Sequence, residues 1–311
     1  MASKPPRATE QRIPRTRRLD SKPTLEILRA IHREDATVAR AVARAIPAIG
    51  KAVDAISQAL QSGGRLFYVG AGTSGRLATL DAAEIPPTFG TPSRLVQAVI
   101  AGGRRALTHA VEGAEDNRAQ GARDLADRRV SQNDVVVGIA ASGSTPYVLG
   151  ALEFARRRGA ITVGVTSNPR SPLSQLAAIS IVTETGPETI TGSTRMKAGT
   201  AQKMVLNMLS TAAMVRMGRV YDNWMVGVAL TNRKLQTRGL RILAEASGAT
   251  VAEATRALRQ SGHNMAIALI ILKNGVTASE AQRRLRNAGG NIRKALSLEV
   301  QTPKGQKKRH G

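Results

Sequence analysis

The amino-acid sequence predicts an α/β fold in which helices cover both faces of a doubly wound, mostly parallel sheet. Short apolar runs alternate with helical patterns from Leu66 onward, and this alternation is typical of such a sheet. Two of the apolar runs lead into small Gly/Ser/Thr loops that are each followed by a helical pattern. Beyond residue 223 only helical patterns remain, which predicts an additional C-terminal helical domain.

Five apolar runs account for the strands of the predicted sheet. Helical spacing of apolar residues covers residues 24–60, and Pro47 is expected to begin a second helix there, because proline suits the first helical turn. Further helices are expected over Pro146–Arg158 and from about Thr194 to Met217. The predicted strands are Leu66–Val69, Leu95–Ile100, Asp134–Ile139, Ile161–Val165 and Ile179–Val182.

Composition and pattern divide the chain into five segments. Residues 1–22 are rich in Pro and Arg and are expected to form an extended basic arm, and residues 23–62 form N-terminal helices. Residues 63–222 form the α/β domain and residues 223–298 the helical domain. Residues 299–311 are expected to form a basic tail.

The helical domain contains an internal repeat with an offset of 27 residues, in which residues 248–254 align with residues 275–281. A duplicated helical hairpin predicts a packing role for this region rather than a chemical one. Each copy has the spacing of a capping box at the start of a helix, formed by Thr250 with Glu253 and by Thr277 with Glu280.

The composition limits the kinds of site and partner that the chain can have. There is no Cys, and the 4 His residues show no paired spacing, so we expect no disulfide and no metal centre. No apolar segment follows the basic N-terminus, and Met265–Leu272 is too short to cross a bilayer, so we expect a soluble intracellular protein.

The net charge of +24 suggests nucleic-acid binding as a function. Against this function, the basic residues are spread along the chain, and only 2% of residues are aromatic and could stack on bases. We therefore expect solvated basic ends and no specific nucleic acid or membrane partner.

A glycine-rich loop follows the first predicted strand. Gly70, Gly72 and Gly75 allow backbone amides to approach an anion closely. Ser74 is expected to cap the following helix, whose free N–H groups also attract anions. Gly72, Thr73 and Ser74 are therefore candidate phosphate-binding residues.

The helix after this loop is expected to stop at a carboxylate. Pro86 disfavours helical geometry for the residue before it, so the helix is expected to end near Glu84. A carboxylate at the negative end of a helix dipole is easier to protonate, which suits a general acid. Glu84 is therefore a candidate catalytic residue.

A second strand–loop–helix unit repeats this arrangement. Ser142, Ser144 and Thr145 follow an apolar run and precede Pro146, which suits the first position of a helix. These hydroxyls and the amides of the helix can bind a phosphate without lysine. No acidic residue stands where the ribose of a dinucleotide would need one, so the two loops favour a sugar-phosphate site.

Glu112, Glu115 and Asp116 form an acidic cluster on a predicted helical turn. Carboxylates this close favour proton transfer, although a solvated helix start has the same pattern. Because the chain offers no Cys, no metal site and no evident Ser–His pair, glutamate is the natural acid or base.

These motifs resemble those of the N-acetylmuramic acid 6-phosphate etherases, a family of the sugar isomerase (SIS) superfamily. The resemblance covers roughly residues 8–298. Ile85 stands where this family often has Cys, a change that removes no required group. The matching motifs are Thr9–Arg12, Gly70–Arg76, Glu84–Gly90, Val111–Asp116, Ala141–Tyr147 and Thr191–Lys203.

The resemblance implies a cytoplasmic, homodimeric lyase of peptidoglycan and amino sugar recycling with a SIS-type domain. Such a lyase cleaves the D-lactyl ether of N-acetylmuramic acid 6-phosphate by elimination and rehydration, without a cofactor. By the same resemblance, Glu115 removes the proton on carbon 2 and Glu84 protonates the departing lactate oxygen. Arg195 and Lys197 stand in a Gly/Ser/Thr-rich turn, where they either bind the substrate's anionic groups or form structural ion pairs.

Three other functions are compatible with parts of this pattern. A non-catalytic sugar-phosphate sensor similar to the glucokinase regulatory proteins shares much of the motif set but would not need both Glu84 and Glu115. An aldose–ketose isomerase on the same fold also removes a proton at carbon 2, so the base alone does not distinguish it. A DNA-binding regulator would need a recognition helix with a basic face, and residues 24–60 show none.

Overall fold

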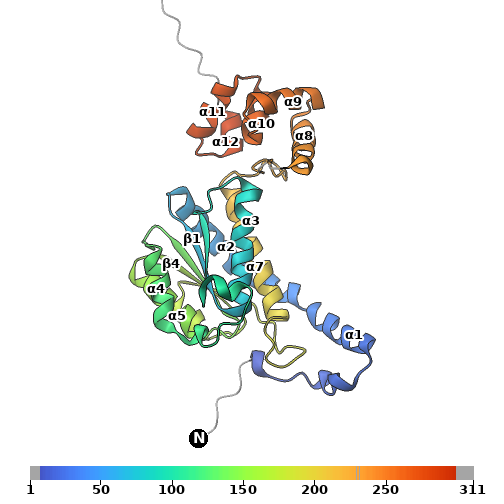
Figure 1. Ribbon diagram of the computed structural model, residues 1–311, viewed down its shortest axis with the longest axis vertical. Helices are drawn as coiled ribbons and strands as arrows, with labels where there is room; N and C mark the ends of the chain where they lie inside the picture. The colour runs from blue at the N-terminus through green and yellow to red at the C-terminus, as the bar shows by residue number, and fades with distance from the viewer. Residues whose placement is uncertain (1–7, 229, 231, 299–311) are drawn as a thin grey trace, which may run out of the picture. The chain divides into compact units, whose positions relative to one another are not determined.

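The computed structural model describes residues 8–228, 230 and 232–298 (Figure 1). Two compact units make up the chain, one ending at Met217 and the other beginning at Gly218. The first unit holds the sheet and the N-terminal helices, and the second is built from helices. Residues 1–7 of the predicted arm and the predicted tail, 299–311, lie outside the described residues.

Five parallel strands form one sheet in the order β2-β1-β3-β4-β5. In the middle of the sheet Leu66 of β1 lies beside Val96 of β2 on one side and Val135 of β3 on the other. All five predicted strands are confirmed, and the burial of β1 and β3 on both faces explains their unbroken apolar runs. The strands are β1 Leu66–Gly70, β2 Val96–Ile100, β3 Val135–Ile139, β4 Ile161–Thr166 and β5 Ile179–Val182.

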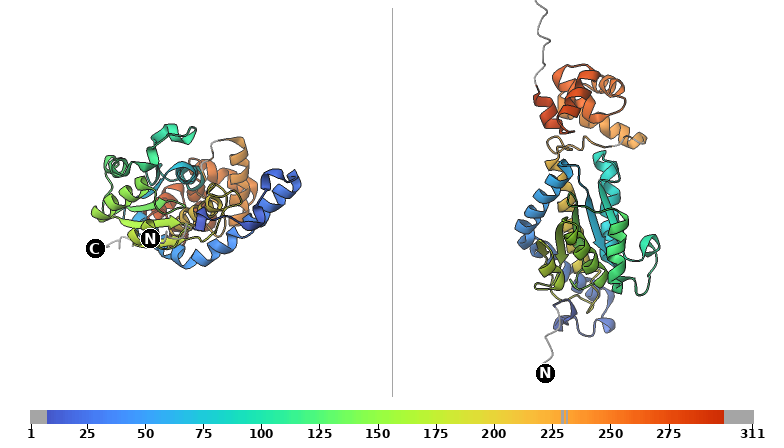
Figure 2. Two further views of the ribbon diagram at one scale, coloured as in Figure 1. Left: turned by 90° about the horizontal axis from the view of Figure 1, so that it is seen from below. Right: turned by 90° about the vertical axis from the view of Figure 1, so that its left-hand side faces the viewer.

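Helices cover both faces of the sheet, as the sequence predicts (Figure 1). Helices α2, α3 and α7 lie on one face, with α7 packed against both of the others, and α4, α5 and α6 lie on the opposite face (Figure 2). No helix among the described residues combines the length and the apolar character that crossing a bilayer requires. The helices are α1 Thr24–Asp35, α2 Val38–Gln61, α3 Gly72–Phe89, α4 Arg118–Asp127, α5 Pro146–Arg157, α6 Pro172–Leu176 and α7 Lys197–Arg216.

Two helix boundaries predicted at prolines are wrong. Helix α2 continues through Pro47, and the break in this region lies earlier, between α1 and α2. Pro47 is exposed, so water can reach the carbonyl that lacks its usual N–H partner while α2 still buries its apolar stripe. Helix α3 likewise passes Glu84 and Pro86 and ends at Phe89, where Gly90 closes it in the left-handed conformation with φ 62°.

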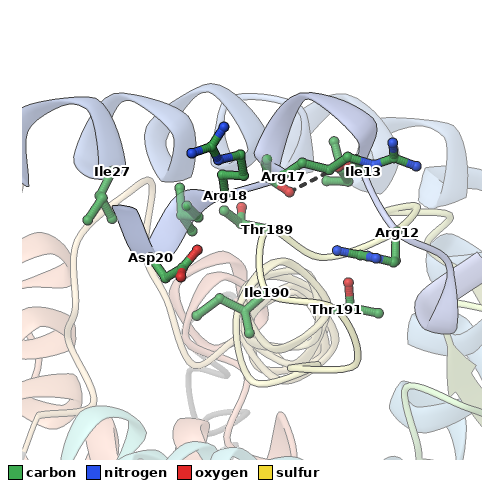
Figure 3. A pocket seen from close by; sticks show the side chains of 11 residues that line it. Arg12, Ile13, Arg17, Arg18, Asp20, Ile27, Thr189, Ile190 and Thr191 are labelled. Carbon is green, nitrogen blue, oxygen red and sulfur yellow. Dashed lines mark hydrogen bonds between the residues drawn. The ribbon is translucent and has the colours of Figure 1, made fainter. Parts of the chain in front are cut away.

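The arm before α1 packs against the α/β unit, which corrects the expectation of an extended, solvated segment. Thr9 is fully buried, Ile13 is 8% exposed, and Arg15 pairs with the buried carboxylate of Glu34. Together with residues 189–191 the arm encloses a cavity of about 420 Å³ (Figure 3). The arm is folded into three short 3₁₀ turns, Ala8–Glu10, Pro14–Thr16 and Leu19–Ser21.

The second unit confirms the predicted helical repeat, since α9 begins at residue 251 and its counterpart α11 at residue 278. Thr250 and Glu253 form a complete capping box at α9. At α11 Thr277 accepts the Glu280 amide, but the Glu280 carboxylate pairs with Arg284, so the second predicted capping box is wrong. The helices are α8 Arg233–Ser247, α9 Val251–Gln260, α10 Met265–Asn274, α11 Ala278–Asn287 and α12 Ile292–Ser297.

Candidate active site

A polar cavity of about 500 Å³ opens where β1 and β3 end. Its volume lies in the range of small-ligand sites, and its lining combines hydroxyls, loop backbone and carboxylates. Among the described residues no lysine or arginine lines it. The lining residues are Glu10, Ala71–Ser74, Glu115, Asp116, Ile139–Ser142, Ser144–Pro146, Gly192 and Thr194.

The position of the cavity follows from the strand order. The chain leaves β1 into α3 on one face of the sheet and leaves β3 into α5 on the other face. Neighbouring parallel strands whose connections diverge in this way leave a crevice between their carboxyl ends, where open α/β sheets bind ligands. The two loops that the sequence singles out therefore meet in one cavity.

The first loop presents the open N-terminus of α3 to the cavity. The helix begins at Gly72, and the residue before it, Ala71, supplies no side-chain cap. The expectation that Ser74 caps the helix is wrong, because Ser74 lies inside the first turn and its Oγ donates to Gln202 Oε1 of α7 at 2.9 Å. The first amides of α3 therefore have no intrahelical or capping partner, which suits an anionic ligand.

The second loop presents hydroxyls and the N-terminus of α5. Pro146 is the first residue of α5, as predicted, and Thr145 does not cap it with its side chain. Ser144 Oγ donates to Ser142 Oγ at 3.1 Å, which places both hydroxyls side by side. Gly143 has φ 67°, and a Cβ there would lie 2.2 Å from Ser171 Oγ, so this tight turn requires glycine.

Two carboxylates stand on the wall of the cavity after β2. Glu115 and Asp116 belong to a short 3₁₀ turn, Ala114–Asp116, that is entered through the left-handed Gly113. Asn117 then caps α4 by accepting the Gln120 amide at 2.9 Å, which ends the acidic turn. Glu112, the third member of the predicted acidic cluster, is exposed and does not line the cavity.

Glu84 lies outside this cavity. It is twelve residues beyond Gly72, a rise of about 18 Å along α3. Because α3 continues to Phe89, Glu84 is not at the end of the helix, and the negative end of the helix dipole does not favour its protonation as predicted. Glu84 is exposed, whereas Asp81, one turn earlier, faces inward and accepts the Ser210 hydroxyl at 3.1 Å. Burial raises the pKa of Asp81 to about 6.

Lys197 is held in a buried ion pair and does not line the cavity. Its Nζ lies 2.8 Å from Glu34 Oε2, and the two side chains are 3% and 4% exposed. Burial opposes ionisation of Glu34, but hydrogen bonds from Lys197 and Arg15 outweigh it and lower the Glu34 pKa. Arg195 is exposed and also does not line the cavity. The geometry of Lys197 favours the structural alternative for this residue.

The structural role of Lys197 predicts that Lys197→Ala acts on stability. Removing one member of a buried ion pair leaves the other charge without its partner, so the free energy of unfolding should fall by about 3 kcal/mol. Denaturant unfolding measures this loss, with the exposed Lys51→Ala as the matched control. Unchanged stability combined with a raised Michaelis constant would instead mark Lys197 as a substrate contact.

Of the predicted site residues, the structure brings seven to one cavity: Gly72, Thr73, Ser74, Glu115, Ser142, Ser144 and Thr145. Glu84, Arg195 and Lys197 lie elsewhere in the same chain. Asp116 of the predicted acidic cluster also lines the cavity, and so do Glu10 and Thr194, which were not predicted as site residues. The motif Thr9–Arg12 was a signal for Glu10, but only the folded arm places it at the cavity.

Comparison with protein-family models matches residues 48–156 to the glucokinase regulatory protein N-terminal SIS domain and residues 117–212 to the SIS domain. The chain is 55% identical over 264 residues to the N-acetylmuramic acid 6-phosphate etherase of Symbiobacterium thermophilum, covering 85% of this chain and 88% of the relative. It is 52% identical over 264 residues to the N-acetylmuramic acid 6-phosphate etherase of an Enterobacter species, covering 85% and 89%. Among solved structures, a phosphoheptose isomerase from Francisella tularensis matches 62% of this chain and 98% of its own, at 18% identity and a TM-score of 0.48.

Proposed function

The chain belongs to the N-acetylmuramic acid 6-phosphate etherase family, and we propose that it cleaves the D-lactyl ether of N-acetylmuramic acid 6-phosphate. The products are N-acetylglucosamine 6-phosphate and D-lactate. Relatives that are 52% and 55% identical over 85% of the chain carry the etherase name, which supports a lyase over a regulator or an isomerase. We place the enzyme in the cytoplasm, because a phosphorylated sugar does not cross a membrane unaided.

One observation carries the assignment of the substrate's phosphate. The N-termini of α3 and α5 open into the same cavity, beside the hydroxyls of Ser142, Ser144 and Thr145. Helix amides without a capping partner, together with hydroxyls, can donate hydrogen bonds to a phosphate and need no lysine. We therefore assign the phosphate to this side of the cavity and the reacting carbons to the side of Glu115.

The proposed reaction is an elimination followed by the addition of water. In the open-chain aldehyde the proton on carbon 2 is acidic, and Glu115 removes it. The bond between carbon 3 and the lactate oxygen then breaks, and Glu84 gives a proton to that oxygen. Water adds to carbon 3 of the unsaturated aldehyde, with Glu84 taking its proton, and carbon 2 regains a proton from Glu115.

Glu84 can act in this scheme only if a second copy of the chain delivers it, because it lies about 18 Å along α3 from the cavity of its own chain. The outer face of α3 supports this arrangement. Leu80 is 51% exposed, and Ala83, Glu84 and Pro87 are exposed on the same helical stripe. An apolar stripe around a carboxylate is suited to contact with another subunit. We therefore propose a homodimer with shared sites.

A second surface supports the dimer. An open apolar groove of about 700 Å³ runs along α7, lined by Val53 of α2 and by Met204, Met208 and Val215 of α7. Since α7 packs against α3, this groove and the stripe around Glu84 belong to neighbouring helices of one layer. A partner subunit that covers one of them is in a position to cover the other.

The test of the proposed function is the reaction of the purified protein with N-acetylmuramic acid 6-phosphate in water labelled with ¹⁸O. We expect D-lactate to be released and the label to appear at carbon 3 of the product sugar. A ketose product without lactate would indicate an isomerase instead. Binding of sugar phosphates without turnover would indicate a regulator instead.

A further inference from the structure

Glu10 stands on the wall of the cavity, on the arm that precedes α1. We propose that its carboxylate accepts a hydrogen bond from a hydroxyl of the sugar chain and so orients the substrate; this inference rests on the proposed function. The side chain is exposed, and within the described residues no hydrogen bond or ion pair occupies its carboxylate. An acceptor at a cavity wall without a partner of its own is available to a ligand.

The residue before Glu10 ties the arm to the phosphate loop. Thr9 is fully buried, and its Oγ1 accepts a hydrogen bond from Asn168 Nδ2 at 3.2 Å. The same Asn168 amide donates to the Ala141 carbonyl at 2.9 Å, directly before Ser142. One buried side chain therefore fixes both the arm and the hydroxyl loop, which sets the position of Glu10 relative to the bound phosphate.

The arm is also anchored on the other side of Glu10. Ile13 is 8% exposed, and Arg15 pairs with Glu34, which in turn pairs with Lys197 at the start of α7. Figure 3 shows this stretch of the arm lying along residues 189–191. The chain from Thr9 to Arg15 is thus held at both ends, and the backbone that carries Glu10 is preorganised.

The chemistry of the substrate decides which of its groups faces Glu10. An ionised carboxylate only accepts hydrogen bonds. The phosphate and the lactyl carboxylate are also acceptors and negatively charged, so they are repelled by Glu10. The remaining groups that donate are the hydroxyls and the acetamido N–H. The N–H is on carbon 2, where Glu115 acts, so we assign it to the side of the cavity near Glu115. The group that faces Glu10 is then a hydroxyl on one of the carbons between carbon 3 and the phosphate.

The test is a comparison of ligand affinities measured by calorimetry on the full chain, which does not require turnover. For Glu10→Ala we expect the affinity for glucose 6-phosphate and for N-acetylglucosamine 6-phosphate to fall at least about tenfold, as expected for a lost hydrogen bond to a charged group. The affinity for inorganic phosphate should stay the same or rise, because a negative charge has been removed. Glu10→Gln, which keeps a neutral acceptor, should lie between wild type and Glu10→Ala. Glu26→Ala, in an exposed ion pair on α1, is the matched control and should change nothing.

The outcomes separate the contact from a structural role and from the proposed function. Sugar phosphate affinities within twofold of wild type would overturn the contact, and so would a parallel loss of phosphate affinity, which indicates a displaced loop. A loss confined to the acetamido sugar would place the contact on the N–H and overturn the hydroxyl assignment. Failure of the wild-type protein to release D-lactate would contradict the proposed function without touching these affinities.

Discussion

Glu115→Gln should abolish the exchange of the carbon 2 hydrogen with solvent and reduce D-lactate release by about a thousandfold. Glu115 is the carboxylate that the family resemblance identifies as the base, and it lines the same cavity as the two loops that we propose bind the phosphate. The amide of glutamine fills the same space but cannot accept a proton at neutral pH. Nuclear magnetic resonance in deuterated water follows the exchange directly, and a coupled assay follows the lactate.

Asp116→Asn is the matched control for this experiment. Asp116 is the neighbouring carboxylate in the same 3₁₀ turn and lines the same cavity, so its removal changes the local charge equally. We expect this variant to retain exchange at carbon 2. If Glu115→Gln kept normal exchange while Asp116→Asn lost it, the base would be Asp116 and the role of Glu115 would be wrong.

Glu84→Gln should stop D-lactate release but leave exchange at carbon 2 intact. Without its acid the enzyme still forms the carbanion next to the aldehyde through Glu115, and this reverts because the lactate oxygen leaves poorly without a proton. The substrate should therefore gain deuterium at carbon 2 without losing lactate. Affinity for the phosphosugar should be close to normal, since Glu84 contributes nothing to the phosphate side of the cavity.

Near-normal lactate release by Glu84→Gln would remove Glu84 from the mechanism. Loss of exchange together with loss of release would show that Glu84 acts before the elimination step. Glu26→Gln provides a control, because it removes an exposed carboxylate on α1 and leaves both α3 and the cavity unchanged. The variant should keep both exchange and release.

The strands were the most predictable part of the fold, and helix boundaries at proline were the least. Buried parallel strands such as Val135–Ile139 are unbroken apolar runs, so local sequence identifies them. Pro47 and Pro86 oppose helix locally, but α2 and α3 each bury a long stripe against the sheet and α7, and this packing outweighs the missing hydrogen bonds. Propensity alone does not contain that contribution.

The loops of the site were predictable, because the carboxyl ends of neighbouring parallel strands meet at one edge of the sheet. The positions and partners of the charged side chains were harder to predict. Lys197 pairs with Glu34 across 163 residues of sequence, and no local pattern predicts a buried ion pair at that separation. Glu10 reaches the cavity only because Thr9 is buried against Asn168, another contact that depends on the fold. For Glu84, the arrangement that we propose requires a second subunit, and a single chain does not show it.

The sharing of the site is tested most directly by a heterodimer of Glu84→Gln and Glu115→Gln chains, purified through two different affinity tags. In a two-fold dimer with shared sites, one site receives both substituted residues and the other receives both native glutamates. We expect the heterodimer to release D-lactate at about half the wild-type rate, while each homodimeric variant is inactive. A heterodimer as inactive as its parents would contradict the account, because it would mean that the two glutamates do not meet across subunits.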